Sequence, residues 1–456
     1  MFSFDAVILA AGEGKRMKSE KSKVLHEVAG KPMIDWVHSA VNDAGINECI
    51  FVVGSRKEQV MQHLGSGVKY ALQEQQLGTG HAVMQAYEFL KDKSGHVLIL
   101  CADTPLITSE TLKSAMQFHI DSNNCATVLT AEAANPKGYG RIERDGSGNV
   151  IKIVEDKDAD ENQKKICEIN SGMYCFSIPH LLEALSLVTN NNEQREYYLT
   201  DTLEILHSKG YNTGAFQVDE EEIYGVNDRI QLAEASAVLR KRINNKLMLE
   251  GVTIIDPCNT FIDAGVKIGR DTTVYPSAFI EGGTTIGTNC VIGPGCRIVD
   301  SFIGDGTRID NSVILESKIG NNVQVGPFAY IRPGSVIGDK AKIGDFVEIK
   351  KSSVGDKTKI PHLAYIGDAE IGSETNIACG VITVNYNGKV KNKTKVGNRC
   401  FIGCNVNLVA PVEVKDNAYV AAGSTITENV PEYSLAIARE KQTNKEGWVT
   451  KKGIWP

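Results

Sequence analysis

The sequence predicts an α/β protein built from two dissimilar parts, a mostly parallel sheet covered by helices and then a parallel β-helix. Three observations predict this fold class. The chain has 456 residues, which is too long for one ordinary core. Up to about residue 250, apolar strand-like runs alternate with helical patterns. After residue 251, aliphatic residues recur every six positions.

The composition is that of a soluble globular protein without a nucleic-acid or membrane partner. Apolar residues make up 42% and charged residues 23%, and no run of 18 apolar residues is present. Residues 1–250 hold 26 Lys and Arg against 35 Asp and Glu, and residues 251–456 hold 23 against 21, so neither half has a strong basic excess. The N-terminus lacks the basic region of a signal peptide. The eleven cysteines contain no Cys-x-x-Cys pair, so we expect reduced cytoplasmic thiols and no zinc site.

Strand-like runs and one helix open the first part. The expected strands are Ala6–Leu9, Ile50–Val53 and Val97–Leu100. Between the first two, Pro32 suits a first helical position, apolar residues follow at helical spacing, and Gly45 suits the stop. Repeated strand–helix–strand order favours a parallel or mostly parallel sheet.

Two further helices complete this part. One is expected at about 80–91 and another at about 227–249, where Gly251 ends the pattern. The later helix carries its apolar residues on one stripe, which is typical of a connector. We therefore expect one domain at 1–226, a linker helix at 227–250 and a second domain at 251–456. The stripe consists of Leu232, Ala235, Leu239, Ile243 and Leu247.

The second part has a six-residue aliphatic period over nearly 160 residues. Neither a helix nor an alternating strand generates this period, whereas a parallel β-helix turns a corner every sixth residue. Glycine often follows the aliphatic, as at Gly287 and Gly304, which suits a corner that needs positive φ or close backbone approach. The repeat breaks at about 383–395, where a polar loop is expected. The clearest run is Ile268, Val274, Ile280, Ile286, Ile292 and Ile298.

A glycine-rich turn follows the first strand, at Leu9–Met17. Small residues there let backbone N–H groups approach phosphate oxygens, and Arg16 and Lys23 add positive charge. The spacing fits neither a dinucleotide fingerprint nor a Walker motif, so a plain tight turn remains an equal alternative.

Other polar residues fall where strands end, the edge at which open α/β sheets bind ligands. Asp103 closes an apolar strand and suits Mg²⁺, with a helix N-cap as the alternative. Gln73, the run Leu77–Gly80 and the run Gly138–Arg141 are polar or glycine-rich turns that could reach a base or sugar. Each of these, taken alone, is more typical of a turn.

The Leu9–Met17 turn followed by Lys23 resembles the sugar-nucleotidyltransferase signature, and with the hexapeptide half nearly the whole chain is similar to the GlmU family. This family joins an N-acetylglucosamine-1-phosphate uridyltransferase to a glucosamine-1-phosphate acetyltransferase. The resemblance implies a Rossmann-like nucleotidyltransferase domain, a left-handed β-helix and Mg²⁺ held by Asp103 and Asn227. It implies sugar contacts from Gly140, Glu155 and Asn170. The implied UTP contacts are Leu9, Ala10, Ala11, Gly12, Lys23, Gln73, Gly78, Thr79, Cys101, Ala102 and Asp103.

The implied reaction is attack of a sugar-1-phosphate oxygen on the α-phosphorus of UTP, with release of pyrophosphate. Lys23, Arg16 and Mg²⁺ would offset the charge that develops. Two departures from the family pattern occur here: Lys15 stands in place of threonine, and Cys101-Ala102 stands in place of Tyr-Gly.

A single histidine, His362, lies in the repeat region, whereas the other eight lie in the first part. A lone histidine is usually a surface or core residue, but Arg332 and Lys350 fall 30 and 12 residues earlier and can be its neighbours in coils of about 18 residues. A neutral imidazole suits removal of a proton from an amine, and the two cations suit a sugar phosphate. A three-histidine zinc site is excluded by the count.

The family resemblance assigns His362 as general base when glucosamine-1-phosphate attacks acetyl-CoA. It implies substrate contacts from Arg332, Lys350, Tyr365 and Asn376. The lysines at 389, 391, 393 and 395 could attract coenzyme phosphates, although a solvated basic loop is the simpler interpretation. The family has Ala and Ser where this chain has Cys379 and Cys404. The remaining implied contacts, on the loop and along the acetyl-CoA path, are Asn385, Tyr386, Cys379, Cys404, Ala422 and Arg439.

The leading hypothesis is a cytoplasmic enzyme that acetylates glucosamine-1-phosphate and then transfers uridylate from UTP to N-acetylglucosamine-1-phosphate. The alternative is a nucleotidyltransferase whose β-helix only scaffolds, oligomerises or senses an effector. Hexapeptide acyltransferases are generally trimers, so we expect a homotrimer in which Arg439 and the tail cross to a neighbour.

Overall fold

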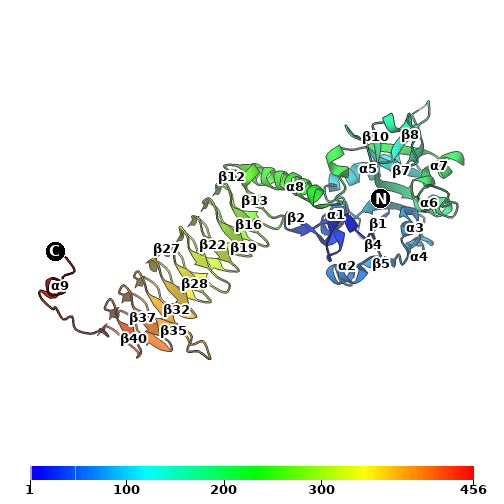
Figure 1. The fold of residues 1–456 in the computed structure, drawn as a ribbon. Helices are drawn as coiled ribbons and strands as arrows, with labels where there is room; N and C mark the ends of the chain where they lie inside the picture. The colour runs from blue at the N-terminus through cyan, green and yellow to red at the C-terminus, as the bar shows by residue number, and fades with distance from the viewer. Residues whose placement is uncertain (1–2, 47, 147, 456) are drawn as a thin grey trace. The chain divides into compact units, whose positions relative to one another are not determined.

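The computed structural model describes residues 3–46, 48–146 and 148–455. The chain folds into two compact units, one up to Leu239 and one from Arg240 onward. The first is an α/β unit and the second is a stack of parallel strands (Figure 1). The predicted fold class is therefore confirmed. Among the described helices, none is both long and apolar enough to cross a bilayer.

The first unit is built on a mostly parallel sheet with the strand order β11-β7-β10-β6-β1-β4-β5. β1 pairs in parallel with both β6 and β4, and β10 alone runs antiparallel between β6 and β7. The three predicted strands are β1, β4 and β6. The strands are β1 Phe4–Ala10, β2 Glu27–Val28, β3 Lys31–Pro32, β4 Cys49–Val53, β5 Lys69–Leu72, β6 His96–Cys101, β7 Ala126–Glu132, β8 Arg141–Arg144, β9 Val150–Val154, β10 Glu168–Ser177 and β11 Thr213–Gln217.

Helices α1 to α7 belong to this unit. α1 begins at Met33, directly after Pro32, and Gly45 adopts φ 93° beyond its end, as the stop signal predicts. The bounds are α1 Met33–Asp43, α2 Lys57–Leu64, α3 Thr79–Met84, α4 Tyr87–Leu90, α5 Ser109–Asp121, α6 Ile178–Leu185 and α7 Asp201–Ser208, with short 3₁₀ turns η1 Lys15–Met17, η2 Lys23–Leu25, η3 Gln163–Lys165 and η4 Glu220–Ile223.

The single helix expected at 80–91 is wrong, because the segment forms two short helices, α3 and α4. The Gln85 side-chain amide donates to the carbonyl of His81 (2.9 Å), the group that the Gln85 backbone N–H would bond in a continuous helix. Gln85 and Ala86 instead form tighter backbone bonds three residues back, and Ala86 is fully buried. The break lets the chain turn while its apolar face stays in the core.

α8 (Arg229–Leu249) lies within the range expected for the linker helix. Its apolar stripe is divided between two cores. Ala235 and Leu239 pack with Val28 and Met33, whereas Leu247 joins the core of the β-helix. Gly251, with φ 99°, ends the helix as predicted.

The second unit is a parallel β-helix of three sheets, whose coils stack along its length (Figure 1). The first sheet holds β12 Thr253–Ile254, β15 Thr273–Val274, β18 Val291–Ile292, β21 Arg308–Ile309, β24 Gln324–Val325, β27 Lys342–Asp345, β30 Lys359–His362, β33 Asn376–Ile377, β36 Phe401–Ile402, β39 Tyr419–Val420 and β41 Leu435–Ala436. The second holds β13 Phe261–Ile262, β16 Phe279–Glu281, β19 Arg297–Val299, β22 Val313–Leu315, β25 Tyr330–Ile331, β28 Glu348–Lys350, β31 Tyr365–Gly367, β34 Ile382–Val384, β37 Asn407–Val409 and β40 Thr425–Ile426. The third holds β14 Lys267–Ile268, β17 Thr285–Ile286, β20 Phe302–Ile303, β23 Lys318–Ile319, β26 Val336–Ile337, β29 Ser353–Val354, β32 Ala369–Ile371, β35 Thr394–Val396 and β38 Val412–Val414. Outside these sheets lie η5 Pro257–Asn259 and α9 Trp448–Lys451.

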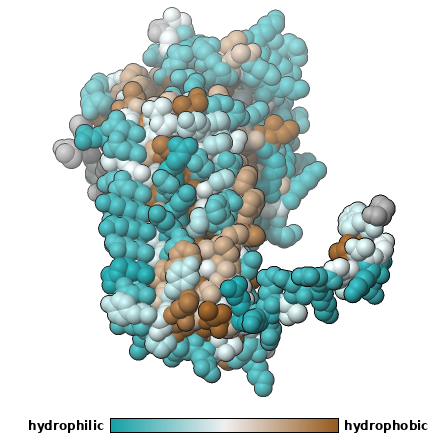
Figure 2. Space-filling view, turned by 90° about the vertical axis from the view of Figure 1, so that its left-hand side faces the viewer, coloured by the Kyte–Doolittle hydropathy of each residue, from teal (hydrophilic) through white to brown (hydrophobic). Residues whose placement is uncertain are grey.

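The six-residue aliphatics point inward and form one continuous core. Ile280, Ile292 and Ile298 have no exposed surface, and Ile268 keeps only 8%. Outside this core, Figure 2 shows a column of hydrophilic residues at one edge of the β-helix and a more apolar band beside it. The period therefore reports which residues face inward, as predicted.

Most of the glycines after the aliphatics serve close approach, although Gly326 also has positive φ (97°). A Cβ on Gly287 would lie 2.3 Å from the Asp305 carboxylate of the next coil, and one on Gly304 would lie 2.7 Å from Gly320 backbone atoms. That carboxylate accepts a hydrogen bond from the Thr288 backbone N–H (2.6 Å), and the same arrangement recurs at later coils. The further acceptors are Asn321, Asp339, Asp356, Ser373, Asn398 and Asp416.

Candidate active sites

The first candidate site is a cavity of about 260 Å³ at the carboxyl ends of β1 and β6. Its lining contains most of the residues expected to hold UTP, brought together from four separate segments. Gln76 and Glu196 also line it, although neither belongs to a motif recognisable in the sequence. The expected residues in the lining are Leu9, Ala10, Ala11, Gly12, Lys23, Gln73, Gly78, Thr79, Cys101 and Asp103.

Lys23 is one of the charged residues that line this cavity. Its ammonium group forms an ion pair with Asp103 and donates to Asn227 Oδ1 at 2.9 Å. Two side-chain oxygens from distant segments thus converge on one cation. The donor set fits Mg²⁺, which prefers oxygen ligands. The helix N-cap alternative for Asp103 is wrong, because Thr108 caps α5 by accepting from the Thr111 N–H.

The glycine-rich turn keeps Lys23 in place. Gly14 has φ 65°, and a Cβ there would lie 2.6 Å from Lys23 Cβ, so only glycine fits. Arg16, on η1, is exposed and faces solvent rather than the Lys23–Asp103 pair. The backbone of the turn and Lys23 therefore form the part of the expected phosphate cradle that lines the cavity.

The second glycine-rich turn packs on the segment before α7. Gly78 has φ 106°, and a Cβ there would lie 2.6 Å from the Tyr197 carbonyl oxygen. Thr79 Oγ1 accepts from the Leu199 N–H at 3.1 Å, and Gln73 donates to the Gly78 carbonyl at 3.1 Å. These bonds fix the turn, so its exposed face toward the cavity is preformed.

Of the neighbouring residues Cys101 and Ala102, only Cys101 lines the cavity as expected. Ala102 is fully buried in the core and does not line the cavity, so its expected contact with the nucleotide is not made by its side chain. Burial, with a further contribution from Asp103, raises the pKa of the Cys101 thiol to about 12. Cys101 is therefore a neutral thiol at the cavity wall and not a nucleophile.

The residues expected to hold the sugar come together through β8, β9 and β10. Gly140 accepts from the Asn170 backbone N–H at 2.9 Å. Asn170 Oδ1 accepts from the Gly172 N–H (2.9 Å) and from the Tyr174 hydroxyl (3.0 Å). Burial raises the pKa of Glu155, and neighbouring acidic residues add to this effect, while a hydrogen bond from Thr200 opposes it. The group is continuous with the cavity, because Gly172 lies against Cys101.

The second candidate site lies on the β-helix around His362, at the end of β30. The ring is exposed, with 57% of the side-chain surface accessible, and its Nδ1 lies 2.6 Å from Asp345 Oδ1. Asp345 occupies the matching position of the preceding coil, on β27. Asp345 belongs to no motif that predicts a site from the sequence.

His362 belongs to a column that contains most residues of the expected acetyl-CoA path. The strand registers place Cys379, Cys404 and Ala422 at the same position of the three following coils. The backbone bonds Asn405 N–H to Cys379 O and Gly423 N–H to Cys404 O, both 2.8 Å, keep this alignment. The lone base and the expected thioester contacts therefore share one edge of the prism.

The corner beside this column changes from bulky to smaller residues after the His362 coil. Phe328, Phe346 and Leu363 occupy it on three successive coils, all with positive φ and more than half exposed. On the next coils the same corner holds Gly380 and then Asn405. Beside these smaller residues, Cys379 is half-buried and Cys404 is exposed.

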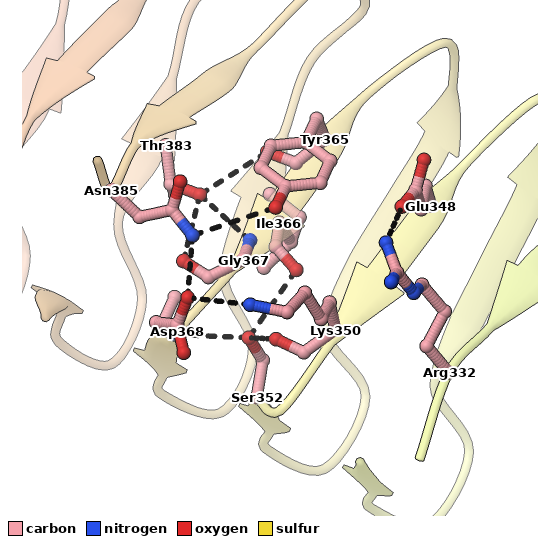
Figure 3. Close-up of polar contacts among 11 residues, drawn as sticks. Arg332, Glu348, Lys350, Ser352, Tyr365, Ile366, Gly367, Asp368, Thr383 and Asn385 are labelled. Carbon is pink, nitrogen blue, oxygen red and sulfur yellow. Dashed lines mark hydrogen bonds and ion pairs between the residues drawn. The ribbon is translucent and has the colours of Figure 1, made fainter. Parts of the chain in front are cut away.

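A polar face adjoins the column on the sheet that contains β28, β31 and β34 (Figure 3). Arg332 and Lys350 are in register on successive coils, and they pair with Glu348 (2.8 Å) and Asp368 (3.0 Å). Although partial burial opposes it, hydrogen bonds from Lys350 and Asn385 lower the pKa of Asp368. The two expected phosphate ligands are thus charged and held in place.

The polar loop forms a small hairpin beyond β34, at the expected break in the repeat. Asn385, at its base, is buried and bonds Asp368 and the Tyr365 hydroxyl (Figure 3). Tyr386 is exposed, and Asn376, on β33, is half-buried on the neighbouring sheet. The loop therefore joins the polar face at Asn385.

The loop lysines have different partners. Lys393 and Lys395 pair with Glu370. Proximity to the Lys350 ammonium lowers the pKa of Lys391, which places this loop lysine beside the polar face. Arg439 is exposed and lies against Gly423 of its own chain, at the end of the column.

Comparison with known proteins relates the two units to different families. Residues 5–225 match the nucleotidyl transferase family, residues 258–345 the GMPPB C-terminal domain, and residues 393–428 the bacterial transferase hexapeptide (six repeats). The chain is 61% identical over 450 residues to the bifunctional protein GlmU of Acetivibrio thermocellus, covering 98% of both chains. It is 60% identical over 443 residues to that of Thermoanaerobacter pseudethanolicus, covering 97% of both.

Sequence identity at this level covers both domains of the chain and not one of them alone. With a nucleotidyltransferase unit and a hexapeptide β-helix in one polypeptide, the chain belongs to the GlmU family of bifunctional enzymes.

Proposed function

We propose that the two candidate sites catalyse consecutive steps in the synthesis of UDP-N-acetylglucosamine. The β-helix site acetylates glucosamine-1-phosphate with acetyl-CoA. The cavity of the first unit then transfers uridylate from UTP to N-acetylglucosamine-1-phosphate. The observation that carries this proposal is the shared column of His362, Cys379, Cys404 and Ala422, because a scaffold has no need of a base beside an open corner.

In uridylyl transfer, an oxygen of the sugar phosphate bonds the α-phosphorus of UTP while the bond to the β-phosphate oxygen breaks. Lys23 supplies positive charge where the phosphates meet, and Arg16 adds to it from η1. Backbone N–H groups of the Leu9–Gly12 turn orient phosphate oxygens. Glu155 and Asn170 position the sugar. No proton transfer is required, because the attacking phosphate oxygen carries negative charge.

We propose that Mg²⁺ binds Asp103 and Asn227, which already converge on the Lys23 ammonium. Bound there, the ion supplies further charge stabilisation for the phosphates. Lys23 is then free to contact the phosphates directly.

In acetyl transfer, the amine of glucosamine-1-phosphate attacks the thioester carbonyl. His362 Nε2 accepts the proton that the amine loses, the new C–N bond forms, and the C–S bond breaks to release coenzyme A. Arg332 and Lys350 bind the sugar phosphate by charge-assisted hydrogen bonds. Tyr365, Asn376 and Asn385 orient the sugar.

The coenzyme is proposed to follow the column past Cys379, Cys404 and Ala422 to Arg439, with Tyr386 on the loop as a further contact. Because this edge is open in a single chain, we propose a homotrimer in which a neighbouring prism covers it. We also propose a cytoplasmic location, since both UTP and acetyl-CoA are supplied there.

Separate variants test the two sites in the full chain. Asp103→Ala is expected to abolish uridylyl transfer and leave acetyl transfer intact, and Asp92→Ala, at an exposed acidic residue of the same unit, is the matched control. Undiminished UTP turnover in Asp103→Ala contradicts the assignment.

His362→Ala is expected to lower acetyl transfer by about 10²-fold or more while uridylyl transfer is unchanged. Thiol release from acetyl-CoA in the presence of glucosamine-1-phosphate measures it. Full acetyl transfer by this variant would reduce the β-helix to a scaffold.

A further inference from the structure

A carboxylate lies directly behind the imidazole that we propose as the acetyl-transfer base. Asp345 Oδ1 and His362 Nδ1 are 2.6 Å apart, and the two residues face each other in the strand register of β27 and β30. This distance is short even for a charge-assisted hydrogen bond. The register fixes the two backbones, so the pair is built into the coil geometry.

The pairing is selective among the carboxylates of the site. Glu348, three residues after Asp345 on the same coil, pairs with Arg332, and Asp368 pairs with Lys350 (Figure 3). The hydrogen bond from His362 lowers the pKa of Asp345, so this carboxylate is ionised at neutral pH. An ionised carboxylate only accepts hydrogen bonds. The proton of a neutral His362 ring therefore lies on Nδ1, and Nε2 carries the free lone pair.

We propose that Asp345 is a positioning residue for acetyl transfer: it holds His362 in the Nδ1–H tautomer and stabilises the imidazolium that forms when Nε2 takes the amine proton. This inference rests on the proposed role of His362 as general base. Asp345 acts through His362 and does not contact the substrates.

The exposure of the pair makes the proposal testable. Asp345 and His362 are 38% and 57% exposed, and an exposed pair contributes little to folding. Removing the carboxylate therefore leaves the β-helix intact, and a change in rate reports on catalysis. Asp310→Ala is the matched control, because Asp310 is also a partly exposed carboxylate with a basic partner, Arg308 (2.8 Å), two coils earlier.

The experiment measures kcat and KM of both reactions in the full chain. Asp345→Ala is expected to lower kcat for acetyl transfer about 10- to 100-fold, the usual cost of removing a carboxylate that orients a histidine. KM for glucosamine-1-phosphate and acetyl-CoA, and uridylyl transfer, are expected to stay within about twofold. Asp345→Asn is expected to be at least as damaging, since its amide can donate to Nδ1 and favour the wrong tautomer. Asp345→Glu is expected to recover part of the rate.

A double-mutant cycle separates this inference from the proposed function. In a His362→Ala background, Asp345→Ala is expected to cause no further loss, because its effect passes through the imidazole. Three outcomes would each overturn the inference. The first is an equal loss of acetyl transfer in the two backgrounds, and the second is a kcat of Asp345→Ala within twofold of that of the unmodified chain. The third is an Asp310→Ala variant that is as impaired as Asp345→Ala. If His362→Ala keeps full acetyl transfer, the proposed base itself is refuted. If His362→Ala is impaired and Asp345→Ala is not, only the role of Asp345 is refuted.

Discussion

Adding one methyl group at Gly304 tests whether the β-helix needs glycine for close packing of its coils. The Cβ of Gly304→Ala would lie 2.7 Å from the carbonyl carbon and oxygen of Gly320, on the next coil. An ordinary contact needs about 3.4 Å or more, so the two coils must separate by roughly 0.7 Å at this corner. Neither backbone atom can rotate away. The Gly304 N–H bond to the Ile319 carbonyl, 2.9 Å long, resists the separation.

The expected change in the free energy of unfolding is the difference between two opposing effects. Forcing an extra carbon into a packed interior costs about 1–3 kcal/mol, and the loss of glycine freedom in the unfolded chain returns about 0.4–1 kcal/mol. We therefore expect Gly304→Ala to destabilise the β-helix by about 1–2 kcal/mol. Urea unfolding followed by far-UV circular dichroism measures it, with uridylyl transfer reporting that the first unit is unaffected.

Gly283→Ala is the matched control for Gly304→Ala. A Cβ at Gly283 meets only Asp300 Oδ1, at an ordinary 3.7 Å, and the residue is exposed. This variant is expected to be as stable as the unmodified chain or slightly more stable. Equal stabilities of the Gly304 and Gly283 variants would refute the close-approach explanation.

Three further predictions concern individual residues of both units. Burial lowers the pKa of His119 to about 3, so below pH 6.5 the unfolded chain binds one more proton and the first unit loses stability as the pH falls. Between pH 7 and pH 5 this loss is about 2 kcal/mol, and His119→Gln is expected to flatten the pH dependence of the urea midpoint. Gly14→Ala places a Cβ 2.6 Å from Lys23 Cβ and is expected to lower uridylyl transfer about 10-fold or more, with acetyl transfer as the control. Lys350→Met is expected to raise KM for glucosamine-1-phosphate about tenfold by removing one charge-assisted bond, and an unchanged KM in initial-rate assays would exclude Lys350 as a phosphate ligand.

Long periodic features of the fold were predictable, because many residues carry the same signal. The six-residue period identified the β-helix, and apolar runs identified β1, β4 and β6. Competition between a side chain and the backbone for the same carbonyl group was not predictable, since it depends on a single residue. The Gln85 amide captures the His81 carbonyl and divides the helix expected at 80–91. Similarly, Ala102 adjoins a cavity residue in sequence but is fully buried in the core, in the turn that follows β6.

Part of the acetyl-transfer site was encoded in the repeat itself. Counting from the inward aliphatic of each coil, Asp345, His362, Cys379 and Cys404 all stand two positions later, and Ala422 does likewise after Val420. Register relative to the core therefore selects the column, including the carboxylate that motif comparison missed. The sequence does not show, by contrast, which partner each acidic residue of the site contacts. Since Asp345, Glu348 and Asp368 are all acidic, only the directions of their side chains decide which one contacts the imidazole and which contact the cations.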